Sequence, residues 1–135
     1  MRTRIQQELA LLTTAYPVVK HAELNGEDWF LLPGYRLPAG WRIHQNAIES
    51  ADLAFKLSAA YPTGEPYAFL LPSGINFKGQ PPANASPTSG VPFPGDWIQF
   101  SWSPEGTWTP AAEAQDGSNI LAWARSFAQR LKEGA

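Results

Sequence analysis

The sequence has 135 residues, of which 44% are hydrophobic and 16% are charged. A chain of this size and composition forms one packed domain, and its charge content is too low for a disordered polymer. The net charge of −2 provides no broad positive surface, so binding to nucleic acid or to an anionic membrane is not expected. The chain contains no cysteine, which excludes disulfides, thiolate metal sites and thioester intermediates.

Hydropathy along the chain argues against a membrane protein. No apolar run approaches the roughly 18 residues that a membrane-spanning helix needs, and the apolar stretch at 9–12 is too short for the core of a signal peptide. The absence of cysteine is also compatible with a reducing compartment. We therefore expect a soluble, cytoplasmic protein.

The first elements are a helix and a hairpin. Ile5, Leu9 and Leu12 recur at helical spacing among polar residues, which predicts an amphipathic helix over 2–14. Tyr16-Pro17 ends it, because proline and the residue before it both disfavour helical backbone. Asn25-Gly26 suits a tight turn with positive φ angles and predicts a hairpin between strands at 18–24 and 28–32.

The middle of the chain continues the sheet. Proline and glycine predict a loop over 33–41. Alternating apolar residues predict a strand over 53–59, and a turn at 61–66 leads into a second strand over 67–71. Together with the hairpin, these strands predict an antiparallel meander of about four strands.

The C-terminal part combines an irregular segment with a helix. Six prolines between residues 72 and 94 predict a long irregular loop that is either functional or disordered. A short strand is expected at 97–102, and apolar residues at helical spacing after Ser118 predict a C-terminal helix, which Ser118 or Asp116 would cap. The resulting order, with strands together and helices at the ends, indicates the α+β class.

Most familiar catalytic patterns are absent. The two histidines, His21 and His44, lie in no metal-binding motif, so no metal or cofactor is expected. No phosphate-binding glycine loop, serine-hydrolase elbow or convincing carboxylate pair occurs either.

The aromatic content is the unusual feature. There are six Trp, seven Phe and four Tyr, and several tryptophans, including Trp41, Trp97 and Trp108, lie close to proline or glycine. Such side chains can anchor irregular loops on the sheet. They can also line a groove for an extended partner, and both interpretations stay open at this point.

The order of motifs resembles the ubiquitin-conjugating-enzyme (UBC) fold. The resemblance depends on the predicted helix and four-strand meander, on Tyr61-Pro62-x-x-x-Pro66-x-x-Phe69, on the long loop, and on Trp108-x-Pro110 before the last helix. Further motifs are similar to a bacterial branch, the prokaryotic UBC family E: Leu37-Pro38-Ala39-Gly40, Pro81-Pro82-Ala83 and Trp97-x-Gln99. The similarity covers about residues 15–132, and it implies a single UBC-like domain over 1–135.

The resemblance also implies where chemistry would occur, and there the chain departs from the family. A UBC enzyme carries its cargo as a thioester on a cysteine in the loop after the fourth strand, near a His-Pro-Asn motif. This chain has Pro72-Ser73-Gly74-Ile75-Asn76, in which only Asn76 matches, followed by the hydroxyls of Ser86, Thr88 and Ser89. We therefore expect a catalytically inactive UBC-like protein.

The partners implied by the resemblance are a ubiquitin-like protein, a ThiF-type activating enzyme and a JAB-type metallopeptidase. The expected role is a non-catalytic partner or adaptor that binds the first or the second of these. The candidate binding residues are Asn76, Trp97, Trp102, Trp108, Tyr61 and Pro62.

Two alternatives remain. One is a stand-alone peptide-binding module that uses the Pro-rich loop and the region of Trp97 and Trp102 as its groove. The other is a conjugating enzyme with a hydroxyl nucleophile, Ser86 or Ser89, or one in which the native cysteine has been substituted.

Overall fold

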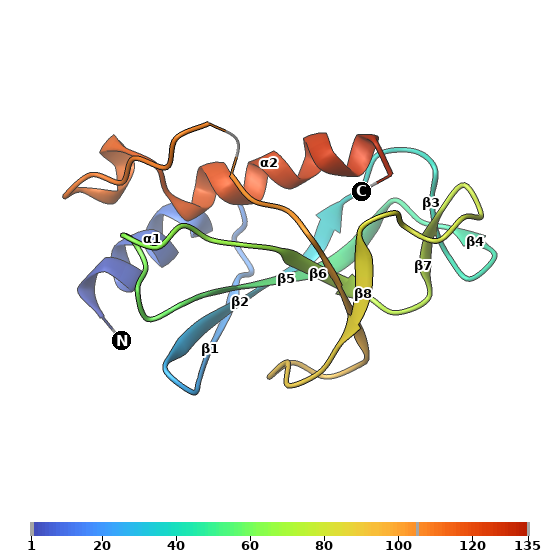
Figure 1. Cartoon of the computed structure of the whole chain (residues 1–135), viewed down its shortest axis with the longest axis horizontal. Helices are drawn as coiled ribbons and strands as arrows, with labels where there is room; N and C mark the ends of the chain where they lie inside the picture. Colours follow the sequence, from blue (N-terminus) through green and yellow to red (C-terminus); the bar gives the residue numbers. More distant parts are fainter. Residues whose placement is uncertain (1, 105, 135) are drawn as a thin grey trace.

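A computed structural model describes residues 2–104 and 106–134. The predicted α+β class is confirmed: an N-terminal helix, antiparallel strands and a C-terminal helix follow one another in the chain (Figure 1). The helices are α1 (Thr3–Thr13) and α2 (Ile120–Lys132), with a short 3-10 helix η1 (Ala114–Asp116) before α2. No helix in these ranges has the length and hydropathy that crossing a membrane would require.

The strands form two antiparallel sheets. The larger sheet has six strands in the order β1-β2-β5-β6-β9-β8, and the smaller has three in the order β4-β3-β7. The strands are β1 (Lys20–Leu24), β2 (Glu27–Arg36), β3 (Trp41–Ile43), β4 (Asn46–Ala47), β5 (Ser50–Leu57), β6 (Phe69–Pro72), β7 (Ile75–Phe77), β8 (Ala85–Thr88) and β9 (Trp97–Phe100).

The predicted hairpin around Asn25-Gly26 is confirmed, but the prediction of a loop over 33–41 was partly wrong. Strand β2 continues through Pro33-Gly34 as far as Arg36. A register shift between Leu32 and Tyr35 accommodates the two residues, and the Gly34 N–H donates a hydrogen bond to the Asp52 carboxylate at 3.1 Å instead of to a neighbouring strand. Trp41 then begins β3.

The segment 72–94 is ordered into strands at two places, so its prediction as an irregular loop was wrong there. β7 pairs with β3, and β8 pairs with β9 at the edge of the large sheet. Pro87 is tolerated in β8 because an edge strand leaves one side of its backbone without a partner strand.

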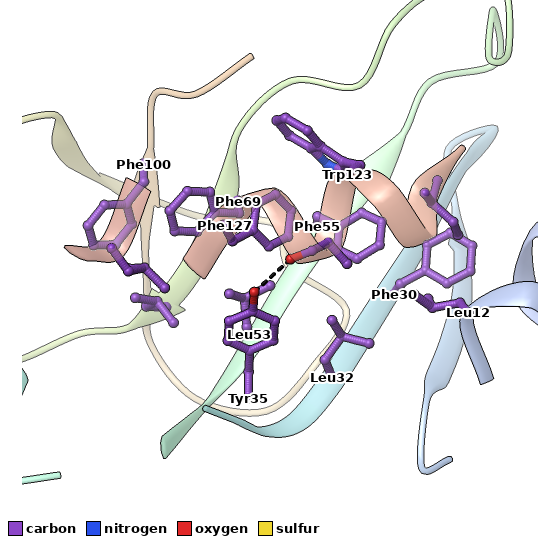
Figure 2. Packing of buried hydrophobic residues seen from close by; sticks show 14 of the residues in the cluster. Leu12, Phe30, Leu32, Tyr35, Leu53, Phe55, Phe69, Phe100, Trp123 and Phe127 are labelled. Carbon is purple, nitrogen blue, oxygen red and sulfur yellow. Dashed lines mark hydrogen bonds between the residues drawn. The ribbon is translucent and has the colours of Figure 1, made fainter. Parts of the chain in front are cut away.

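The main hydrophobic core lies between one face of the large sheet and the two helices. Phe30, Phe55 and Phe69 from three strands meet Phe127 of α2, and the Phe69 and Phe127 rings lie 4.7 Å apart (Figure 2). The Tyr35 hydroxyl donates a hydrogen bond to the Ala124 carbonyl at 2.6 Å, which joins β2 to the middle of α2 (Figure 2). Both helices lie on this face of the sheet (Figure 1).

The opposite face of the sheet carries a second, smaller cluster. Because side chains alternate along a strand, the residues next in sequence to the core residues point away from the helices. This outer cluster comprises Trp29, Leu31, Ala54, Leu70 and Trp97, with Ala22, Val91 and Phe93 packed against it. Residues of the 89–96 segment therefore cover part of the outer face.

The N-terminus of α2 is capped by a residue that the sequence prediction did not choose. The Asn119 side chain accepts a hydrogen bond from the Ala122 N–H at 2.9 Å. Ser118 instead accepts a hydrogen bond from the Thr109 N–H at 2.9 Å, and Asp116 lies in η1. The predicted caps were wrong because both residues precede the first helical turn by too many positions.

Candidate functional site

Tyr61, Pro62 and Trp108, three of the predicted binding residues, lie together. The Trp108 indole N–H donates a hydrogen bond to the Pro62 carbonyl at 2.9 Å, and the Trp108 and Tyr61 rings are 6.0 Å apart. Trp108 therefore attaches the segment before α2 to the turn before β6. The indole is half-buried, so part of its surface remains open to solvent.

Tyr61 itself belongs to the core. Its side chain is 1% exposed, and its hydroxyl donates a hydrogen bond to the buried carboxylate of Glu8. Burial raises the pKa of the Tyr61 hydroxyl, and the hydrogen bond to Glu8 raises it further, because both disfavour the tyrosinate. Tyr61 is thus a structural residue that packs against Trp108. Its side chain is not available to a partner.

A cavity of about 190 Å³ opens between the segment after β9 and α2. Most of its wall is apolar, and the polar groups in it come from the start of α2 and its exposed side. The lining residues are Trp102, Pro104, Thr107, Trp108, Ser118, Ala122, Trp123, Ser126 and Gln129. We call this the tryptophan cavity; an apolar concave surface with a few polar groups is the usual form of a binding site.

The walls of the tryptophan cavity are held in place by neighbouring polar groups. The Ser126 hydroxyl donates to the Trp123 carbonyl at 2.6 Å and accepts a hydrogen bond from the Trp102 indole at 3.4 Å. The Arg130 guanidinium lies 5.2 Å from the centre of the Trp102 ring, a cation–π arrangement. Trp102 is therefore fixed on its α2 side, with a positive charge over its ring.

Sequence reasoning missed the contribution of α2 to this cavity. Ala122, Ser126 and Gln129 follow each other at helical spacing, but their pattern in the sequence is typical of the ordinary solvent-facing side of an amphipathic helix. Trp123 is 2% exposed, and its indole N–H has no hydrogen-bond partner among the described residues. The only sequence signal was the tryptophan itself at a helix position beside the apolar stripe.

Trp97 lies away from this cavity. It belongs to the outer cluster on the other face of the sheet, where its indole donates a hydrogen bond to the Phe93 carbonyl at 3.4 Å. Trp102, by contrast, packs against the main core. The structure therefore does not bring Trp97 and Trp102 into one groove, as the peptide-binding alternative requires.

Asn76 holds a turn. Its side-chain amide donates to the His44 carbonyl at 2.9 Å, and its side-chain oxygen accepts a hydrogen bond from the Gly79 N–H at 3.0 Å. Both polar atoms of the side chain are thus used in joining β7 to the neighbouring turns. Asn76 does not line the tryptophan cavity.

The candidate hydroxyl nucleophiles lie on or just after the edge strand β8. Ser86 and Ser89 are exposed, and Ser89 and Thr88 line a cavity of about 220 Å³ together with Asp96. No histidine is among the described residues that line this cavity. Without an imidazole or a comparable base, a serine hydroxyl remains a weak nucleophile.

A neighbouring cavity of about 400 Å³ has a different polar lining. His44, Ser73, Asp52 and Asp96 contribute to its wall. No hydrogen bond joins these four side chains to one another in the described part of the chain, so they do not form a catalytic triad.

Searches of family models, curated protein sequences and solved structures found no match to this chain.

Proposed function

We propose that this protein is a catalytically inactive UBC-like protein that serves as a binding partner or adaptor in a bacterial ubiquitin-like modification system. Its ligand would be a ubiquitin-like protein or the ThiF-type activating enzyme. The proposal is supported by the α+β order of elements, by the contact between Trp108 and the Tyr61-Pro62 turn, and by the motif order in the sequence. In this proposal the UBC-like meander corresponds to β1, β2, β5 and β6.

The composition supports a role without covalent chemistry. The chain has no cysteine, so a thioester cannot form on it. The hydroxyls that remain near β8 lie at a cavity whose described lining holds the carboxylate of Asp96 but no imidazole. A hydroxyl has a far higher pKa than a thiol, and an oxyester transfers its acyl group poorly without an activating base.

The observation that carries the binding role is the tryptophan cavity. Trp102 and Trp108 are half-buried and offer rigid apolar surface at low cost in side-chain entropy, which is typical of the anchoring points of protein interfaces, and the buried Trp123 forms part of the cavity wall. The polar groups of Ser126 and Gln129 in its wall can complete hydrogen bonds to a partner. We expect the cavity to receive one apolar side chain of the partner.

The experiment is a binding measurement with a bacterial ubiquitin-like protein and a ThiF-type activating enzyme, chosen from genes adjacent to this one where such genes occur there. We expect a complex with at least one of them in gel filtration, and a saturable heat signal in calorimetry. Ala122→Glu places a carboxylate at an exposed position in the cavity wall and should weaken binding at least about tenfold. Ala10→Glu, at an exposed position of α1, is the matched control and should leave the affinity unchanged.

Four outcomes would count against the proposal or a part of it. Absence of binding to both proteins would remove the adaptor role, and binding only to proline-containing peptides would favour the peptide-binding alternative. Equal affinities of Ala122→Glu and Ala10→Glu would show that the partner does not use the tryptophan cavity. An alkali-sensitive adduct, formed on incubation with activating enzyme, ATP and the ubiquitin-like protein, would favour the hydroxyl-nucleophile alternative.

A further inference from the structure

We infer that the β1–β2 hairpin binds a divalent transition-metal ion such as Zn²⁺ through His21, Glu23 and Asp28. This inference is independent of the proposed function. The three side chains each place one potential ligand atom within 4.8 Å of the other two. The sequence contains no metal-binding motif there, and only the pairing of the two strands brings the three residues together.

The register of the hairpin explains the cluster. Glu23 on β1 lies directly opposite Asp28 on β2, and His21 lies two residues before Glu23. Residues two apart on a strand project to the same face, so all three side chains share one face of the hairpin. The short connection at Asn25-Gly26 fixes this register, because a change of one residue would send Asp28 to the opposite face.

A hydrogen bond joins two of the three candidate ligands. The His21 Nε2 atom lies 2.8 Å from an Asp28 carboxylate oxygen, closer than two ligands of one ion lie to each other. Two ligands about 2 Å from one tetrahedral ion are separated by about 3.3 Å, so small side-chain rotations would open this contact to admit an ion. Asp28 is 6% exposed and His21 is packed against the Phe30 ring, which limits the rotamers that the site has to select.

The ligand types point to a transition metal. An imidazole nitrogen combined with two carboxylate oxygens suits Zn²⁺ and its first-row neighbours, whereas Mg²⁺ and Ca²⁺ prefer sets composed of oxygen alone. A cavity of about 260 Å³ borders Glu23 and Asp28 and provides space for water to complete the coordination.

Arg2 lowers the affinity of the site for a metal ion. Its guanidinium lies 3.8 Å from Asp28 and is held by hydrogen bonds to the carbonyls of Tyr61 and Ala59, at 2.6 and 3.3 Å. This positive charge offsets part of the negative charge of the site without occupying the position between His21 and Asp28. Replacing it with a neutral residue should therefore tighten Zn²⁺ binding by up to about fifteenfold, the effect of one unit charge on a divalent ion about 5 Å away in water.

The experiment is a titration of the full chain with Zn²⁺, followed by calorimetry, and with Co²⁺, followed by visible absorption. We expect one ion per chain and a spectrum of a nitrogen- and oxygen-ligated ion, with no competing thiolate because the chain lacks cysteine. His21→Ala should abolish saturable binding. His44→Ala removes the other histidine, an exposed one, and should leave binding unchanged.

Two further variants make the test independent of folding defects. Glu23→Gln changes an exposed residue and should weaken Zn²⁺ binding at least about tenfold while circular dichroism stays unchanged. Arg2→Ala should strengthen binding. The inference is overturned if wild type shows no saturable binding, if His44→Ala weakens binding as much as His21→Ala, or if Glu23→Gln binds like wild type.

Discussion

The carboxylate of Glu8 in α1 accepts a hydrogen bond from the backbone N–H of Ile120, the first residue of α2, at 3.0 Å. The first N–H groups of a helix have no partner within the helix, and a negative charge near them is favourable. Glu8 is completely buried, and its second oxygen accepts hydrogen bonds from Arg4, at 2.9 Å, and from Tyr61. One side chain thus connects both helices to the turn that begins β6.

Removing the Glu8 carboxylate should therefore destabilise the whole fold. Glu8→Ala leaves the Arg4 guanidinium, the Tyr61 hydroxyl and the Ile120 N–H without their acceptor in a buried site, and we expect a loss of about 3–5 kcal/mol in the free energy of unfolding. Urea unfolding followed by tryptophan fluorescence measures this loss. Glu49→Ala, at an exposed residue, is the control and should change stability by less than about 0.5 kcal/mol.

Substitutions at Gly40 and Gly34 distinguish two reasons why a position requires glycine: a positive φ angle and a lack of space for a side chain. Both have positive φ, at 108° and 66°, but a Cβ atom at Gly40 would lie 2.7 Å from the Phe77 ring, whereas one at Gly34 would meet nothing within 4 Å. Gly34→Ala should cost about 1 kcal/mol from backbone strain alone, and Gly40→Ala about 3 kcal/mol because overpacking is added. Equal losses in thermal or urea unfolding would show that the Phe77 ring moves away freely.

The cap of α2 provides a direct comparison between the observed and the predicted residue. Asn119→Ala removes the side-chain acceptor for the Ala122 N–H and the donor to the Ala114 carbonyl, so we expect a loss of about 1–2 kcal/mol. Ser118→Ala removes only the acceptor for the Thr109 N–H and should cost less. The reverse order of the two losses, measured by urea unfolding, would contradict the capping role of Asn119.

Stability should fall in alkaline solution because of two buried tyrosines. Burial is the main cause that raises the pKa of Tyr35 and of Tyr61 in the folded state, so the unfolded chain loses these protons first. The stabilisation is complete below about pH 10 and is lost above it, by up to about 1.4 kcal/mol per pH unit for each tyrosine.

Urea unfolding from about pH 8 to about pH 12 tests this dependence, and tyrosinate absorption follows the ionisation directly. In concentrated denaturant all four tyrosines should ionise near their usual pKa. A free energy of unfolding that stays constant across this range would contradict the expected dependence.

The sequence was most informative where a local pattern determines local structure. The helical spacing of Ile5, Leu9 and Leu12 and the Asn25-Gly26 turn predicted α1 and the first hairpin, and both are present. The apolar stripe that includes Trp123 and Phe127 likewise predicted α2, where both residues are buried. These features depend mainly on residues a few positions apart.

The failures involve partners that are distant in the sequence. The pair Pro33-Gly34 is typical of a loop, but the Asp52 side chain and a register shift keep these two residues within β2. The short strand β7 forms only because β3 lies beside it. Glu8 resembled a surface residue of an amphipathic helix, and only the approach of Tyr61 and Ile120 makes its burial favourable.

The candidate site was predicted in part for the same reason. Trp102 and Trp108 were both predicted to be binding residues, and they do line one cavity. The third wall comes from α2, and Trp97 projects to the other face of the sheet because it is an odd number of residues away from Phe100. Which aromatic residues share a face depends on whether they lie an even or an odd number of residues apart along a strand, and on tertiary packing. A single sequence does not reveal the tertiary packing.

The position of Pro87 in the edge strand β8 has a consequence for how the molecules behave in a crowded solution. An edge strand offers unpaired backbone groups to any other extended chain, but proline has no N–H to donate. The other edge, β1, carries the charged residues Lys20 and Glu23. Both borders of the large sheet are thus poor templates for strand addition, which protects this tryptophan-rich protein against growth into fibres.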